Sequence, residues 1–265
     1  MCLILLAHRV FAGFPLVLAA NRDEFFERPT ASAGYWPDAP DILGGRDLAQ
    51  GGTWLGVSRD GRWGAVTNFR DGSPAPAGSR SRGALVAQYL RGGCRAGDYL
   101  NQLGETAHDY HGFNLLVADA SGVRYFSNRA AQPVSLAPGL YGLSNHLLDT
   151  PWPKVAHGKR ALSALADSAA ADRDGNRLAG ALFTLLENRA AAPDSELPRT
   201  GVSGEWEKLL SPMFIAAPGY GTRASTILMA DHAGNVQFHE RSFGPDGTLQ
   251  QAQSFRIEAG VSVSG

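Results

Sequence analysis

The sequence predicts an α+β fold in which antiparallel sheets are covered by helices. Strand-like runs follow one another as hairpins, and amphipathic helices come in pairs between the hairpins, which argues against alternating βαβ units. The 265-residue chain is 44% hydrophobic, enough for a full core, and we find no repeat, linker or low-complexity segment in it. We therefore expect a single domain over residues 1–265.

The first predicted element is a hairpin of residues 1–8 and 14–20 around a short glycine-containing turn. If the turn centres near Ala12, the numbers of paired residues sum to about 23 to 25. Cys2 is then expected opposite one of residues 21–23. A thiol held beside an amide, a guanidinium and a carboxylate has the neighbours that a nucleophilic cysteine needs.

The turn-rich stretch at residues 29–45, with Tyr35 and Trp36, is interpreted as a surface loop that either covers a pocket or packs over a sheet edge. Glycine-rich residues 44–52 are interpreted as a loop that approaches a strand or a ligand closely. The remaining predicted elements are hairpins at 51–58 with 62–69 and 113–118 with 123–128, helices at 81–90, 96–108, 153–167 and 178–186, and strands at 140–144, 225–230, 236–243 and 249–257.

Composition excludes several classes of function. The 24 basic and 25 acidic residues form no run of like charge, so neither nucleic acid nor an anionic membrane surface is an expected partner. No segment has the apolar length of a membrane span, and two cysteines argue against a disulfide scaffold. The apolar start of the chain is interpreted as core strands, because Arg9 and Pro15 interrupt it and no basic segment precedes it. We expect a cytoplasmic protein with a small-molecule partner.

Removal of Met1 would make Cys2 the first residue. Its α-amine has a reference pKa of about 7.7 to 8.0 and its thiol one of about 8.5, so the amine can serve as the base that activates the thiol. Asp23, brought across the hairpin, is placed to orient that amine. The same chemistry operates in hydrolases that use an N-terminal threonine.

Strand-like segments end on Asn68 and Asn145, and we predict that these amides donate to a transition-state oxyanion. Arg22 and Arg223 are the candidates to stabilise a thiolate. The candidate substrate contacts are Asn21 and Arg22, from the Asn21–Glu24 box that follows the first hairpin, and the aromatic residues Trp54, Phe69 and Tyr141. No metal site is predicted.

Each of these residues also has a purely structural interpretation. Cys2 is the kind of small apolar residue that begins a core strand, and the charges of residues 22–24 suit an ion-paired strand exit. Asn68 and Asn145 suit strand ends as turn formers, and the aromatic rings suit a core.

Seven motifs in order along residues 1–226 resemble those of the NRDE family, the homologues of the transport and Golgi organization protein, and the similarity extends to about residue 240. The motifs are MCLIL (1–5), AANRDEF (19–25), LGGRDL (43–48), GGTWLG (51–56), AVTNFR (65–70), YGLSN (141–145) and YGTRAST (220–226). More distantly, the layout is similar to the choloylglycine hydrolase and penicillin V acylase branch of the N-terminal-nucleophile hydrolases.

The distant resemblance implies a four-layer αββα sandwich with the thiol at the edge of the central sheets. It implies Cys2 as nucleophile, Asp23 as the acid that orients the amine, Asn68 and Asn145 as oxyanion or substrate-orienting amides, and Arg223 as a late arginine of the site. The acylases have an arginine directly before the box, where this chain has Ala20. The guanidinium is instead inside the box, as Arg22.

Two functions follow as hypotheses. The first is an N-terminal cysteine hydrolase that cleaves a non-peptide C–N amide through a thioester and needs no cofactor for catalysis. The second comes from the association of the NRDE family with haem trafficking and with lipid or acyl-CoA metabolism. It is a non-catalytic carrier of haem, or a binder related to lipid or acyl-CoA, on the same fold.

Overall fold

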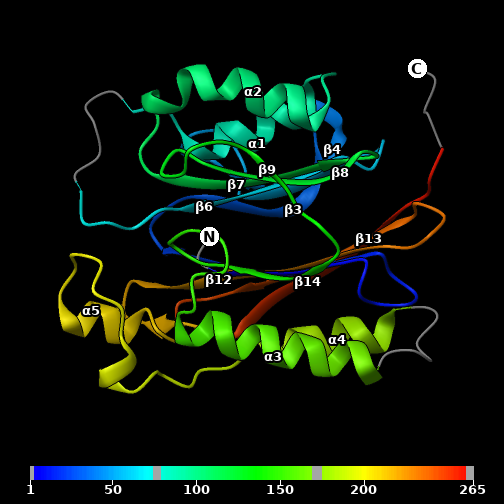
Figure 1. Ribbon diagram of the computed structural model, residues 1–265. Helices are drawn as coiled ribbons and strands as arrows, with labels where there is room; N and C mark the ends of the chain where they lie inside the picture. The colour runs from blue at the N-terminus through cyan, green and yellow to red at the C-terminus, as the bar shows by residue number, and fades with distance from the viewer. Residues whose placement is uncertain (1–2, 74–78, 169–174, 261–265) are drawn as a thin grey trace.

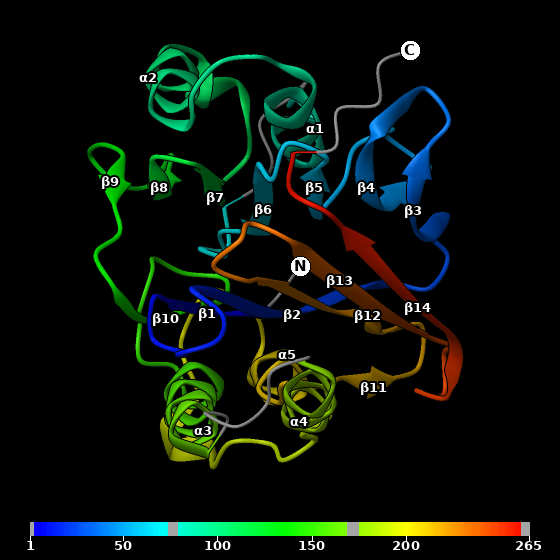
Figure 2. The same cartoon turned by 90° about the vertical axis from the view of Figure 1, so that its right-hand side faces the viewer.

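Two antiparallel sheets pack face to face, and helices cover the outer face of each (Figure 1). This computed structural model describes residues 3–73, 79–168 and 175–260. Figure 2 looks along the helices and shows one pair above the sandwich and another pair below it. The α+β class and the four-layer αββα arrangement that the sequence and its resemblance predicted are confirmed.

The sheet that carries the chain start is called the first sheet. Its strands, in spatial order, are β10 (Gly139–Leu143), β1 (Leu3–His8), β2 (Leu16–Phe25), β12 (Tyr220–Ala230), β13 (Val236–Phe243) and β14 (Leu249–Ile257), with β11 (Ala216–Ala217) beside β12. The second sheet runs in sequence order through β3 (Thr30–Trp36), β4 (Ala39–Asp47), β5 (Leu55–Ser58), β6 (Trp63–Asn68), β7 (Phe113–Asp119), β8 (Gly122–Ser127) and β9 (Val134–Ser135).

The helices form the two outer layers. Helices α1 (Arg82–Arg91) and α2 (Ala96–Thr106) cover the second sheet, and α3 (Pro153–Ser168) and α4 (Asn176–Leu186) cover the first, with α5 (Gly204–Leu209) further along the chain. Short 3₁₀ turns follow α2 (Ala107–Asp109) and precede α5 (Asp194–Glu196). No helix among the described residues combines the length and the apolar character needed to cross a membrane.

Strand β1 shows how one strand contributes to two cores. Leu3 and Leu5 pack against α3 and α4, whereas Ile4 and Leu6 pack in the core between the two sheets. Side chains of a strand alternate between its two faces, and each face of β1 packs against a core. Both faces are therefore apolar, and every residue of the strand is buried. A third core lies between the second sheet and helices α1 and α2.

The predicted register of the first hairpin is confirmed. Leu3 pairs with Asn21 and Ile4 with Ala20, so paired numbers sum to 24. Strand β2 continues beyond the predicted end at residue 20 and runs to Phe25, because β12 pairs with it along this whole length. The Asn21–Glu24 box therefore lies within a strand.

The prediction of a surface loop at residues 29–45 was wrong, because the segment forms the β3–β4 hairpin of the second sheet. Residues 44–47, predicted as part of a glycine-rich loop, complete β4. Glycine is needed at these two positions because neighbouring atoms leave no room for a side chain. A Cβ on Gly44 would lie 2.6 Å from the Leu55 carbonyl oxygen, and one on Gly45 would lie 2.2 Å from the Trp54 ring. Helix α5 was not predicted; the hydroxyl of Ser203 caps its first turn.

Candidate functional site

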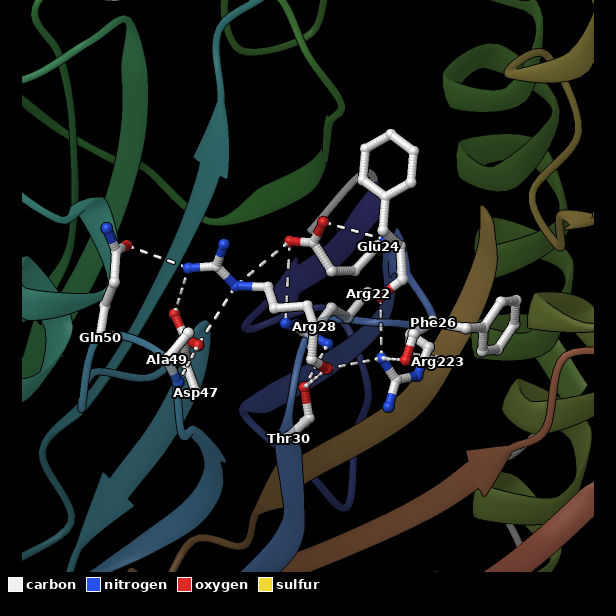
Figure 3. A network of polar contacts seen from close by, with 10 residues as sticks. Arg22, Glu24, Phe26, Arg28, Thr30, Asp47, Ala49, Gln50 and Arg223 are labelled. Carbon is white, nitrogen blue, oxygen red and sulfur yellow. Dashed lines mark hydrogen bonds and ion pairs between the residues drawn. The ribbon is translucent and has the colours of Figure 1, made fainter. Parts of the chain in front are cut away.

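The four box residues alternate across β2 and so serve two faces of the first sheet. Asn21 and Asp23 contact groups on the helix-covered side, whereas Arg22 and Glu24 face the second sheet. Figure 3 shows the polar contacts that Arg22 and Glu24 make. One short strand segment thus supplies side chains to two different environments.

Asn21 is fully buried and connects three segments of the chain. Its amide donates to the carbonyl oxygens of Leu186 at 2.9 Å and Met213 at 2.8 Å, and its oxygen accepts a hydrogen bond from Ser225 at 2.6 Å. Both N–H donors of the side chain are therefore used within the protein. Asn21, a predicted substrate contact, therefore anchors β2 to these three segments.

Asp23 is 4% exposed, and its two oxygens differ in their partners. Oδ1 accepts a hydrogen bond from the Thr222 hydroxyl at 2.6 Å. Oδ2 is buried and has no hydrogen-bond partner among the described residues. A buried charged acceptor without a partner carries a desolvation cost of more than about 1–3 kcal/mol. Cys2, the predicted nucleophile, lies outside the described residues, and its neighbour Leu3 pairs with Asn21.

Arg22 is 4% exposed and lies over the Trp54 ring, with 4.3 Å between its Cζ and the ring centroid. It donates to the Thr30 hydroxyl at 3.2 Å, and its Nη2 lies 3.8 Å from Glu24 Oε2. Burial lowers the pKa of the guanidinium, and the nearby Glu24 charge opposes that shift. The cation is thus held in place chiefly by an aromatic face and one hydroxyl.

A polar pocket of about 220 Å³ opens beside Arg22 and Trp54. Figure 3 shows Arg28 between Glu24 on one side and Asp47 and Gln50 on the other. Arg28 Nη2 lies 2.7 Å from Asp47 Oδ2, and this hydrogen-bonded pair raises the pKa of Arg28. The pocket is lined by Arg22, Glu24, Arg28, Asp47, Gln50, Thr53, Trp54, Val66, Asn68, Ser81, Arg82 and Gly83.

The structure brings Asn68 and Asn145 together. Asn68 ends β6, and its exposed side chain lines the pocket. Asn145 follows β10 and is 4% exposed; its amide donates to the Asn68 carbonyl oxygen at 3.0 Å, and its own carbonyl accepts from the Arg70 N–H at 2.7 Å. Strand β10 pairs with β1 on the side opposite β2, so Asn145 approaches the start of β1 from that side.

Three other predicted site residues do not line this pocket. Phe69 packs against the His146 ring at 4.8 Å, and the Tyr141 hydroxyl donates to the Ala137 carbonyl oxygen at 2.8 Å. Arg223 donates to the carbonyl oxygens of Phe25, Phe26 and Arg28, and burial lowers its pKa. Arg223 therefore fixes the turn that follows the box and sets the position of Arg28.

Sequence reasoning missed Glu24, Arg28, Asp47, Gln50 and Arg82 as pocket residues. The available signal was the charged pair Arg46–Asp47, which follows Gly44 and Gly45 and ends β4. No group of three or more histidine, cysteine, aspartate or glutamate side chains suited to a metal ion occurs in the described part of the chain.

Glu240 lies fully buried between the sheets and joins them. Its carboxyl group accepts from the Ala33 N–H of β3 at 2.6 Å and from the Thr226 hydroxyl of β12 at 3.2 Å. Burial raises the pKa of this group from its ordinary value of 4.5 to about 7, although these two hydrogen bonds and the Arg22 charge act in the opposite direction.

We expect Glu240→Gln to stabilise the fold increasingly as the pH rises. Between pH 4.5 and about 7 the unfolded chain has lost this proton while the folded chain retains it, so the wild type loses stability over that interval, by about 3 kcal/mol at 1.36 kcal/mol per unit. Urea unfolding at pH 5 and pH 8 measures the change in the difference between variant and wild type. The same difference at both pH values would contradict this prediction. The exposed Glu105→Gln variant is the control.

Residues 1–245 match the family model described as "Transport and Golgi organisation 2". The chain is 37% identical over 267 residues to the Transport and Golgi organization protein 2 homolog of Bos taurus, covering 93% of this chain and 94% of that protein. It is 38% identical over 247 residues to the homolog of Homo sapiens, covering 87% of each chain.

Two solved structures show a weaker likeness. A variant of the conjugated bile acid hydrolase from Clostridium perfringens superposes with a TM-score of 0.46 at 10% identity, over 100% of both chains. The Caenorhabditis elegans ortholog of N-acylethanolamine-hydrolyzing acid amidase gives a TM-score of 0.43 at 11% identity, over 86% of this chain and 92% of the other.

Proposed function

Given that the chain belongs to the Transport and Golgi organisation 2 family, whose name states a cellular process and no reaction, we propose from its site that it is an N-terminal cysteine hydrolase. The bond cleaved is a non-peptide C–N amide, and the intermediate is a thioester on Cys2. The observation that carries the proposal is the buried Oδ2 of Asp23, which has no partner among the residues that the structure describes and is close to the beginning of β1.

The missing partner of Asp23 is, in this proposal, the α-amine of Cys2. Residue 2 is one peptide unit, about 3.8 Å between Cα atoms, from Leu3, and Leu3 pairs with Asn21. Continued by one residue, the antiparallel register would set Cys2 opposite Arg22 and its amine toward Asp23. An ammonium group there would satisfy the orphaned oxygen and compensate its buried charge.

The alternation of β1 supports the same assignment for the thiol. Ile4 faces the second sheet, so residue 2 would face it too, on the side where Arg22 lies over Trp54. A guanidinium beside a thiol favours the thiolate and lowers the pKa of the cysteine. Arg22 would then stabilise the thiolate, as the arginine directly before the box does in the acylases.

The reaction proceeds in two balanced halves. The α-amine of Cys2 accepts the thiol proton, and the sulfur attacks the amide carbon of the substrate. The tetrahedral oxyanion then collapses, and the amine of the substrate leaves with the proton that the α-amine returns. Water then adds to the thioester, giving a carboxylic acid and the free thiol. Asn68 and Asn145 are the proposed amide donors to the oxyanion; the bond to the Asn68 carbonyl uses one of the two N–H groups of Asn145.

The first test is whether Cys2 is a free, activated N-terminal residue. Intact-mass measurement is expected to show that Met1 is absent. Limiting iodoacetamide at pH 6.5, followed by peptide mass spectrometry, is expected to label Cys2 at least about tenfold faster than Cys94, because only a thiolate reacts. Cys94, a partly exposed free thiol in the same chain, is the internal reference.

Retention of Met1, or equal labelling of the two thiols, would overturn the hydrolase proposal. A non-catalytic carrier needs no free amine and no activated thiol, so those outcomes would favour the second hypothesis. That hypothesis has its own measurement, a shift of the haem absorption spectrum when haem is titrated into the purified chain.

A further inference from the structure

We propose that the pocket beside Trp54 binds a small anionic group, a carboxylate or a phosphate, at the N-terminus of α1. As a statement about the substrate, this rests on the proposed hydrolase function; as a statement about binding, it stands on the pocket alone. It commits the substrate class to amides that carry a small group of this kind, because the pocket measures about 220 Å³.

The first wall of the pocket is the start of a helix. Helix α1 is ten residues long and begins at Arg82, and Ser81, Arg82 and Gly83 all line the pocket. The Ser81 side chain makes no capping hydrogen bond, and the first turn contains no acidic residue. Backbone N–H groups and the positive end of the helix dipole therefore face the pocket without an anionic group from the helix itself.

The second wall supplies an independent donor. Trp54 is 5% exposed and lines the same pocket, yet its Nε1–H has no hydrogen-bond partner in the described parts of the chain. An indole nitrogen donates and never accepts, so the group that completes it has to bring an acceptor oxygen. Arg22 lies against the ring face of Trp54, which adds a positive charge next to that donor.

The charges of the pocket leave an excess of one positive charge. The lining contains Arg22, Arg28 and Arg82 and the carboxylates of Glu24 and Asp47; Arg82 donates to the Gly112 carbonyl oxygen at 3.3 Å. Asp47 is held by two hydrogen bonds from Arg28, at 3.2 and 2.7 Å, and Glu24 lies 3.8 Å from both Arg22 and Arg28. With both carboxylates engaged by Arg22 and Arg28, a bound anion would be attracted by the helix terminus and by the net positive charge of the lining.

A glycine contact holds the two walls at a fixed separation. The Thr53 N–H donates to the Gly83 carbonyl oxygen at 3.1 Å. A Cβ on Gly52 would lie 2.4 Å from the Gly83 carbonyl carbon, and one on Gly83 would lie 3.2 Å from Thr53 N. Because no side chain intervenes, the start of α1 packs directly on the segment that precedes Trp54, and the donors are positioned before any ligand arrives.

The test uses the indole N–H signals of the full-length chain. Its five tryptophans give separate ¹H–¹⁵N resonances, and the signal lost in Trp54→Phe identifies Trp54. Phosphate and succinate are titrated separately, with sodium chloride at equal ionic strength as the reference. We expect a saturable shift of the Trp54 signal with at least one of the two anions and none of the Trp63 signal; the anion that acts shows whether the group is a phosphate or a carboxylate.

Affinity provides the second readout, measured by calorimetry with the same anion. Trp54→Phe keeps a ring under Arg22 but removes the N–H, and is expected to weaken binding about tenfold, the loss of one charge-assisted hydrogen bond. Trp63→Phe, in the core between the sheets, is the matched control and should bind as the parent does. The four remaining indole signals report whether each variant is folded.

A Trp54 signal that stays in place with both anions, or that moves equally with chloride, would overturn the anion site. That result would leave the labelling of Cys2 unaffected, whereas retention of Met1 would overturn the hydrolase and leave the anion titration unaffected. The two proposals therefore fail in separate experiments.

Discussion

Replacing Cys2 by Ala is expected to lower kcat by at least about 10⁴-fold for any N-acyl amide that the parent chain hydrolyses. The thiol forms the covalent bond of the proposed intermediate, and removing a nucleophile has cost about 10⁶-fold in a serine hydrolase. Alanine is small enough to keep the removal of Met1, so the α-amine stays in place and only the sulfur is lost. Steady-state kinetics of the purified variant measures the effect.

The matched control for this experiment is Cys94→Ala. Cys94 is the other free thiol, partly exposed and packed beside the core under α1 and α2. Its replacement is expected to leave kcat within about twofold of the parent, since Cys94 packs against the helix-covered core of the second sheet, whereas β1 and β2 belong to the first. Turnover by Cys2→Ala within about threefold of the parent would contradict a thioester mechanism.

Asp23→Asn is expected to lower kcat by about 10²- to 10³-fold with little change in KM. The substitution keeps the acceptor for Thr222 but puts an N–H₂ group where Oδ2 faces the proposed ammonium, so the amine loses its anionic partner and its orientation. Without that partner the pKa of the α-amine falls, and the acidic limb of the rate profile is expected to move to lower pH.

The pH profile separates this role from a structural one. A variant that is only less stable would lose rate equally at every pH, and urea unfolding would show it. Thr222→Val removes the hydrogen bond to Oδ1 while leaving Oδ2 unchanged, and its expected loss of kcat is below about tenfold. An Asp23→Asn profile parallel to that of the parent would contradict the contact with the amine.

Regular periodicity predicted most of the fold. Apolar runs of strand length predicted β1 and β2, and counting across their turn predicted the observed pairing of Leu3 with Asn21. The spacing of apolar residues predicted α1 within one residue of its observed bounds. These elements could be predicted because burial of an apolar face dictates their pattern.

The pocket could not be predicted in full, because it depends on the pairing of β3 with β4, and the composition of these two strands is typical of turns. Residues 29–45 are rich in glycine and proline, which usually mark turns, and the close packing of Gly44 and Gly45 becomes visible only with their neighbours in place. Once β3 and β4 pair, Thr30 lies opposite Asp47, and this pairing brings Arg28 to the carboxylate. Arg223 was predicted as a partner of the thiolate from its charge and from the resemblance; in the structure it lies at a β-bulge and donates to the Phe25 and Arg28 carbonyl oxygens.

The position of β1 has a practical consequence for anyone who produces this protein. The strand lies between β10 and β2 rather than at an edge, and Leu3 is already fully buried. In the proposed mechanism, an affinity tag joined ahead of Cys2 would cap the α-amine that serves as the base. A tag after β14, which is an edge strand of that sheet, would keep the α-amine of Cys2 free, so activity is best measured on protein tagged at that end.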